Sequence, residues 1–148
     1  MNTFQSERSG NNASFLWFGL VGLVLIGLDQ LIKFLVFNNH IRFDSFTKFH
    51  NYKFAFSIDF PVALIFIVYA AILAILVAYI VKEHSRFDLG QWLAWTLIFS
   101  GAISNITERI LLGYVRDFLY LYGGGIVNLA DFYIISGILI LLLRKKDK

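Results

Sequence analysis

Hydrophobic residues along this 148-residue chain gather in four long runs that are separated by polar segments. The runs cover about residues 14–37, 61–81, 90–112 and 126–143. Each is close to the roughly 20 apolar residues that an α-helix needs to cross a bilayer. We therefore expect an all-α membrane protein with four transmembrane helices, built as a single integral membrane domain over residues 1–148. The polar residues 1–13 are expected to form a frayed tail, and the first apolar run is too long for a cleavable signal peptide.

The segment 38–60 has a different pattern, in which large apolar residues alternate loosely with polar ones. These residues are Ile41, Phe43, Phe46, Phe49, Tyr52, Phe54 and Phe56. Alternation of this kind predicts short strands, and the aromatic content is typical of the headgroup level of a membrane. We expect a small extracytoplasmic β-cradle here, with an ordinary interfacial loop as the alternative. The segment 113–125 ends in three glycines, which predicts a flexible flap or a tight turn.

The distribution of lysine and arginine between the predicted loops indicates the orientation in the membrane. One side would carry Arg8, Lys82, Arg86, Arg144, Lys145, Lys146 and Lys148. The other would carry Arg42, Lys48, Lys53 and Arg116. The richer side is expected to be cytoplasmic, and four helices place both termini there. The segments 38–60 and 113–125 would then lie outside the cell membrane.

Composition agrees with this class of protein and narrows its chemistry. The chain is 58% hydrophobic and 16% charged, with a mean hydropathy of +0.69, which is rare for a soluble domain. Cysteine is absent, so disulfides, thiolate metal sites and a cysteine nucleophile are excluded. The three histidines are scattered, so no metal or other cofactor is expected. The net charge of +3 is small, and the basic C-terminus indicates a cytoplasmic anchor rather than a nucleic-acid surface.

Two clusters of polar residues lie inside the apolar runs, where they are costly. Asp29 and Lys33 are four residues apart and so share one helical face. They could stabilise packing as an ion pair, reach the outer interface, or support an active site there. Asn105, Glu108 and Arg109 also share a face at the end of the third run. The three residues could form a buried polar contact between helices, or Arg109 could bind a carboxylate, a lipid phosphate or a substrate carbonyl.

Asp117 and Asp131 lie at the edges of the last two apolar runs, with the glycine-rich turn between them. A reversal of the chain would bring the two carboxyl groups together. Two carboxylates a few ångströms apart cannot both ionise cheaply, so one keeps a proton, and the pair can then act as a base and an acid. This pattern indicates an intramembrane aspartic protease. The alternative is that Asp117 is a solvated loop residue and Asp131 a helix cap.

Five short segments, in order along the chain, resemble the signatures of the lipoprotein signal peptidase (signal peptidase II) family. They are DQLIK from Asp29, NYKFAF from Asn51, GAISNITER from Gly101, GYVRDF from Gly113 and VNLAD from Val127. They are similar to D-x-x-x-K, N-x-G-x-A-F, G-G-x-x-N-x-x-D-R, G-x-V-x-D-F and F-N-x-A-D respectively. Each is weak alone, but five in the family's order are highly specific.

The resemblance implies a membrane aspartic endopeptidase with Asp117 and Asp131 as its catalytic pair. Asn51, Asn105, Arg109 and Asn128 would surround the substrate and the pair, with Asp29, Lys33 and Glu108 as further support. The substrate would be a diacylglyceryl-modified prolipoprotein, cut just before its lipidated cysteine. The resemblance also implies a prokaryotic plasma or inner membrane, contact with phospholipid and no nucleic acid. We expect a monomer with its active site near the extracytoplasmic face.

The chain departs from the family pattern at four positions. Lys53 and Ala102 replace glycines, Glu108 replaces an aspartate and Val127 replaces a phenylalanine. These changes leave open a catalytically inactive or repurposed relative that binds lipidated peptides without cutting them. A small proton-coupled carrier is a further alternative. It is disfavoured because the charges gather at the outer ends of the runs and no internal repeat is present. A structural membrane subunit would not need two carboxylates in matching motifs.

Overall fold

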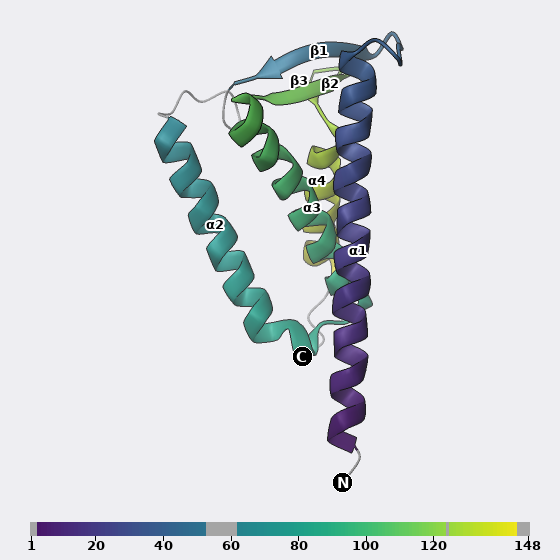
Figure 1. Cartoon of the computed structure of the whole chain (residues 1–148), viewed down its shortest axis with the longest axis vertical. Helices are drawn as coiled ribbons and strands as arrows, with labels where there is room; N and C mark the ends of the chain where they lie inside the picture. Colours follow the sequence, from purple (N-terminus) through teal and green to yellow (C-terminus); the bar gives the residue numbers. More distant parts are fainter. Residues whose placement is uncertain (1–2, 53–61, 124, 145–148) are drawn as a thin grey trace.

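The computed structural model describes residues 3–52, 62–123 and 125–144, and these are mostly helical (Figure 1). The elements in chain order are α1 (Thr3–Phe37), β1 (Phe46–Asn51), α2 (Val62–Glu83), the short 3-10 helix η2 (His84–Arg86), α3 (Leu89–Leu112), β2 (Val115–Leu121), β3 (Gly125–Val127) and α4 (Leu129–Leu143). α3 packs most extensively against α4 and α1, whereas α2 leans away from the other helices. A small sheet covers the end of the helices at which α1 and α3 end and α4 begins.

The helices lie close to the predicted apolar runs, with two corrections. α1 begins at Thr3, so the polar residues expected to fray continue the helix, which costs little once a helix has formed. α4 begins at Leu129 rather than at residue 126, because residues 126 and 127 belong to β3. Within the part of the chain that the structure describes, Leu16–Phe37 is the stretch long and apolar enough to cross a membrane, and α4 is a shorter apolar helix of 15 residues. The number of transmembrane helices stays a prediction.

The sheet is antiparallel, with the strands in the order β1-β2-β3. Phe49 pairs with Asp117, and Leu119 pairs with Val127. The prediction of strands in 38–60 is confirmed for β1, while Lys53 and the rest of the segment to residue 60 lie outside the described residues. The tight turn predicted at the glycine-rich end of 113–125 is confirmed, because β2 and β3 form a hairpin there, whereas the two strands themselves were not predicted. Gly123 and Gly125 have φ values of 76° and 92°, which suit the hairpin connection rather than a mobile flap.

Gly101 determines how closely α3 approaches α4, as expected of a small residue between membrane helices. A Cβ atom at this position would meet the carbonyl oxygen of Ala130 and lie 2.7 Å from Cγ1 of Ile134. Ala130 precedes Asp131 in the first turn of α4. The absence of a side chain at Gly101 therefore sets the position of the turn that carries Asp131.

Gly101→Ala is expected to lower the free energy of unfolding by about 1–3 kcal/mol, because the added methyl group overpacks this contact. It should also shift Asp131, since the first turn of α4 has to move. Gly27→Ala is the matched control, because a Cβ there meets nothing within 4 Å. That variant should be neutral or more stable by up to about 1 kcal/mol. The measurement is the thermal unfolding of both variants in detergent, and equal stability of the two would contradict the packing argument.

Candidate active site

Asp117 lies in the middle of β2, and its side chain is buried, with 1% of its surface exposed. The alternative of a solvated loop carboxylate is therefore wrong. Asp131 is the third residue of α4, and Asn128 is the residue that caps the helix. The Asp131 carboxylate accepts a hydrogen bond from the Asn128 backbone N–H (3.0 Å), and the Asp131 N–H donates to Oδ1 of Asn128 (3.1 Å). The idea that Asp131 takes part in capping is thus correct in part, because this exchange is a capping box.

Three asparagine side chains hold the two carboxyl groups. Asn128 Nδ2 donates to Oδ1 of Asp117 (2.6 Å), and Asn51 Nδ2 donates to Oδ2 of the same residue (2.9 Å). Asn105 Nδ2 donates to Oδ1 of Asp131 (2.9 Å). Asn128 therefore contacts both aspartates and joins them. Each carboxylate oxygen holds one N–H donor and keeps a further lone pair that a water molecule or a substrate could use.

Lys33 lies beneath this pair and is completely buried. Its Nζ contacts Asp29 Oδ2 (2.8 Å), Glu108 Oε2 (3.1 Å) and Asn105 Oδ1 (3.1 Å), which uses all three ammonium hydrogens. The predicted Asp29–Lys33 pair is confirmed, whereas the alternative in which it reaches the interface is wrong. Because an ammonium group can only donate, it requires the oxygen of the Asn105 amide. The nitrogen of that amide is then left to face Asp131.

Asp29 connects α1 to the first turn of α4. Its Oδ1 accepts the backbone N–H of Ala130 (3.0 Å), and its Oδ2 accepts the hydroxyl of Ser104 (2.6 Å). The Ala130 N–H is one of the first four helical donors, which have no partner inside the helix. The Asp29 carboxylate therefore gives this N–H an acceptor. It lies at the N-terminus of α4, which is the positive end of the helix dipole, next to Asp131.

Glu108 makes a contact that the sequence analysis missed. Its Oε1 accepts from Nε of Arg116 (2.6 Å), and its Oε2 accepts from the Arg116 backbone N–H (2.9 Å). Arg116 also donates to Gln30 (3.0 Å), which donates to Ser104 (2.9 Å). From the sequence, Arg116 is predicted only as a charge in an outer loop. The one sequence signal for a structural role of Arg116 is its position directly before Asp117. A contact that fixes Arg116 also fixes the next residue of β2.

The structure thus brings together most of the predicted site residues. Asp29, Lys33, Asn51, Asn105, Glu108, Asp117, Asn128 and Asp131 form one hydrogen-bonded cluster. Arg109 lies half-buried in the last turn of α3, and its role stays a prediction. The charges of Lys33 and Arg116 balance those of Asp29 and Glu108. Among the described residues, no three histidine or carboxylate side chains are grouped so that they could hold a metal ion.

Burial raises the pKa of Asp117 from 3.8 to about 6. The hydrogen bonds from Asn128 and Asn51 oppose this shift, and the nearby charge of Asp131 adds to it. A carboxyl group with such a pKa keeps its proton in about one molecule in ten at pH 7, far more often than an ordinary aspartate does. It can therefore act as a general acid where an ordinary aspartate could not.

Comparison of the sequence with known proteins points to a family of peptidases. The family model described as "Signal peptidase (SPase) II" matches residues 21–145. A lipoprotein signal peptidase from Streptococcus pneumoniae (strain ATCC BAA-255 / R6) is 32% identical over 135 residues, covering 84% of this chain and 88% of the relative. One from Psychromonas ingrahamii is 26% identical over 156 residues, covering 93% and 86%.

Solved structures give the same result for the fold. One, titled as a bacterial membrane enzyme at 1.9 Å resolution, has a TM-score of 0.73 at 26% identity, covering 88% of this chain and 94% of that one. A second, titled as a bacterial membrane enzyme at 2.3 Å resolution, has a TM-score of 0.71 at 23% identity, covering 88% and 93%. The fold is therefore that of a bacterial membrane enzyme, and its class is a peptidase. The chain belongs to the signal peptidase II family, which confirms the resemblance found in the sequence.

Proposed function

We propose that this chain is an aspartic endopeptidase that removes the signal peptide from diacylglyceryl-modified prolipoproteins. It would cut just before the lipidated cysteine, with Asp117 and Asp131 as the catalytic pair. The observation that carries this proposal is the connection of two aspartates through Asn128 in a family of signal peptidases. The relatives named lipoprotein signal peptidase support the substrate class.

The chemistry follows from a pair that holds one proton. The ionised carboxylate takes a proton from a water molecule, whose oxygen attacks the carbonyl carbon before the cysteine. The neutral carboxyl group donates its proton to the carbonyl oxygen. Collapse of the resulting intermediate breaks the C–N bond, and the new amine takes a proton from the pair. No covalent enzyme intermediate forms. Burial raises the pKa of Asp117 to about 6, so we take Asp117 as a member of the pair that can hold the shared proton near that pH, although the two carboxyl groups titrate together.

The polar cluster would serve this pair rather than react. Asn51, Asn105 and Asn128 hold the carboxyl groups. Lys33 holds Asn105, Asp29 holds the first turn of α4, and Glu108 holds Lys33. We place Arg109 beside the substrate on the strength of its motif alone.

We further propose four transmembrane helices with both termini in the cytoplasm and the sheet at the extracytoplasmic interface. Large apolar side chains are exposed on α1, α2, α3 and α4, including Leu23 (67%), Ile75 (69%), Leu111 (74%) and Leu142 (74%). Exposed apolar surface of this extent needs a lipid or protein cover. The aromatic content of the sheet supports its place at the headgroup level, where a lipid-linked substrate could reach Asp117 and Asp131 from the bilayer.

The experiment that tests the proposal is a cleavage assay with the purified protein in nanodiscs. Its substrate is a diacylglyceryl-modified prolipoprotein, and the same prolipoprotein without lipid is the comparison. Mass spectrometry should find a product that begins with the lipidated cysteine. If the folded protein bound the lipidated substrate without cutting it, the proposal would fail, and the chain would be a non-catalytic relative.

The rate of cleavage should depend on pH through Asp117. Since its pKa is about 6, the pair loses its last proton as the pH rises through that value, and the acid is then missing. We expect kcat/KM to fall about tenfold for each pH unit well above 6. The folded state also gains stability from protonated Asp117; this contribution is complete below about pH 4 and is lost as the pH rises through about 6. Initial rates from pH 5 to 9 check this, and a rate that kept rising to pH 9 would contradict the assignment.

A further inference from the structure

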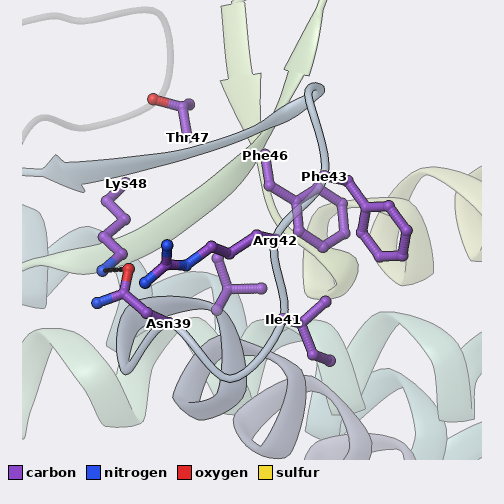
Figure 2. A pocket seen from close by; sticks show the side chains of 8 residues that line it. Asn39, Ile41, Arg42, Phe43, Phe46, Thr47 and Lys48 are labelled. Atoms are coloured by element: carbon purple, nitrogen blue, oxygen red, sulfur yellow. Dashed lines mark hydrogen bonds between the residues drawn. The ribbon is translucent and has the colours of Figure 1, made fainter.

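A cavity of about 340 Å³ lies beside the end of α1, apart from the aspartate pair (Figure 2). This volume is within the range of about 300–1,000 Å³ that is usual for small-molecule sites. Its walls come from the last turn of α1, the connection 38–45 and β1. The lining residues are Val36, Asn39, Ile41, Arg42, Phe43, Phe46, Thr47 and Lys48.

The turn that follows α1 shapes one wall of the cavity. Asn39 has a φ of 61°, a left-handed conformation that asparagine tolerates better than most residues. Its N–H donates to the carbonyl oxygen of Val36 (3.1 Å), and the His40 N–H donates to that of Leu35 (2.8 Å). These two bonds form a Schellman motif, which satisfies the end of the helix. The Asn39 side chain is thereby turned towards β1.

Two cations occupy the side of the cavity near Asn39. Lys48 Nζ donates to Oδ1 of Asn39 (2.6 Å), so its position is held while two of its hydrogens stay available. The guanidinium of Arg42 points towards the same place (Figure 2). Arg42 makes no hydrogen bond or ion pair with any residue in the described ranges. Asp44, in the same connection, does not line the cavity.

The opposite side of the cavity is aromatic and apolar. The rings of Phe43 and Phe46 meet edge to face, with centroids 5.1 Å apart, and Phe46 also packs against Phe118 of β2 (5.4 Å). Phe43 is 65% exposed, although it is large and apolar. The cavity thus combines a site for an anion with a surface for hydrocarbon.

We propose that this cavity binds the phosphate of an anionic phospholipid from the outer leaflet. Arginine suits a phosphate because its planar fork can donate two parallel hydrogen bonds, and Lys48 adds a point charge. Phe43 and Phe46 would contact the glycerol and the first part of the acyl chains. This assignment depends on the membrane placement given under the proposed function. It is separate from substrate recognition, because a diacylglyceryl group carries no phosphate.

A simpler role for the two cations would be to neutralise the negative end of the α1 dipole. Two observations disfavour that role. The Schellman motif already occupies the carbonyl groups of Leu35 and Val36, and the hydrogen bond of Lys48 goes to the Asn39 side chain. The Arg42 guanidinium points towards Lys48 and Asn39 on the cationic side of the cavity (Figure 2).

The test measures binding of short-chain phosphatidylglycerol to the full chain in a zwitterionic detergent by native mass spectrometry. Arg42→Gln and Lys48→Gln should each weaken binding on the order of tenfold, as expected for the loss of a hydrogen bond between charged groups. Arg42→Lys should weaken it too, because it keeps the charge and loses the fork. Lys82→Gln is the matched control, because Lys82 is an exposed lysine in the last turn of α2 and does not line the cavity. This variant should bind the lipid as the unmodified chain does.

The proposed site would be wrong if Arg42→Gln and Lys82→Gln weakened lipid binding equally, or if Arg42→Lys bound the lipid fully. Either result would show that the lipid is attracted by surface charge in general. Inorganic phosphate is titrated as a second arm. If it competed at concentrations similar to those of the lipid, the ligand would be free phosphate and the lipid assignment would be wrong. Cleavage of lipidated prolipoprotein is measured on the same samples in phosphatidylcholine nanodiscs and should be unchanged by these variants. Lipid binding that requires Arg42, without any cleavage, would leave the site standing and reject the peptidase proposal.

Discussion

Asp117→Asn and Asp131→Asn are each expected to lower kcat for prolipoprotein cleavage by about 10²–10⁴-fold, the usual contribution of a general acid or base. Asparagine has nearly the size of aspartate but can neither take the proton from water nor give one to the carbonyl oxygen. KM should change little, because we expect the substrate to bind mainly through its acyl chains and signal peptide rather than through the two carboxyl groups. Initial rates with lipidated substrate in nanodiscs are the measurement.

The control for this pair is Asp44→Asn, which removes an exposed carboxylate from the connection before β1. It should keep the rate of the unmodified chain. Thermal unfolding of each variant has to accompany the rates, because the new amide at position 117 faces the N–H donors of Asn51 and Asn128 and costs some stability. Near-normal cleavage by a folded Asp117→Asn or Asp131→Asn variant would reject the catalytic assignment.

Lys33→Met should cause the largest loss of stability among single substitutions in the cluster. It leaves Asp29 and Glu108 buried without their shared cation, and breaking a buried pair in this way typically costs about 3–5 kcal/mol. Asn105 would also lose the donor that orients its amide towards Asp131. Unfolding in detergent, followed by circular dichroism, should show a lower midpoint, and cleavage should fall with it.

Two further variants separate the loss of charge from the loss of packing. Lys82→Met changes an exposed lysine in the same way and should stay within about 0.5 kcal/mol of the unmodified chain. Lys33→Met combined with Asp29→Asn restores the charge balance, because Glu108 keeps Arg116 as its partner. The double variant should recover part of the lost stability. A midpoint as low as that of Lys33→Met alone would show that packing, rather than the unpaired charge, accounts for the loss.

Much of the fold was predictable because it follows from local patterns. Runs of apolar residues determine where helices form, and the Asp29–Lys33 pair follows from the geometry of one helical turn. The five motifs identified the family, which the comparison with relatives confirms. The sheet was only partly predictable. β1 has a loose alternation of its own, whereas β2 has three buried and two half-buried positions without regular alternation, and a glycine turn follows it that equally suits a loop.

The sequence by itself determined the class of protein, the approximate helices and the residue types available for chemistry. Only the tertiary structure decided which of these residues meet. Lys33 and Asn105 are 72 residues apart, and Arg116 and Gln30 are 86 apart, so no local spacing could relate them. Asn128 joins the two aspartates because the β2–β3 hairpin returns the chain to the start of α4. Buried donors and acceptors must find partners wherever packing places them, and that requirement acts on the folded chain as a whole.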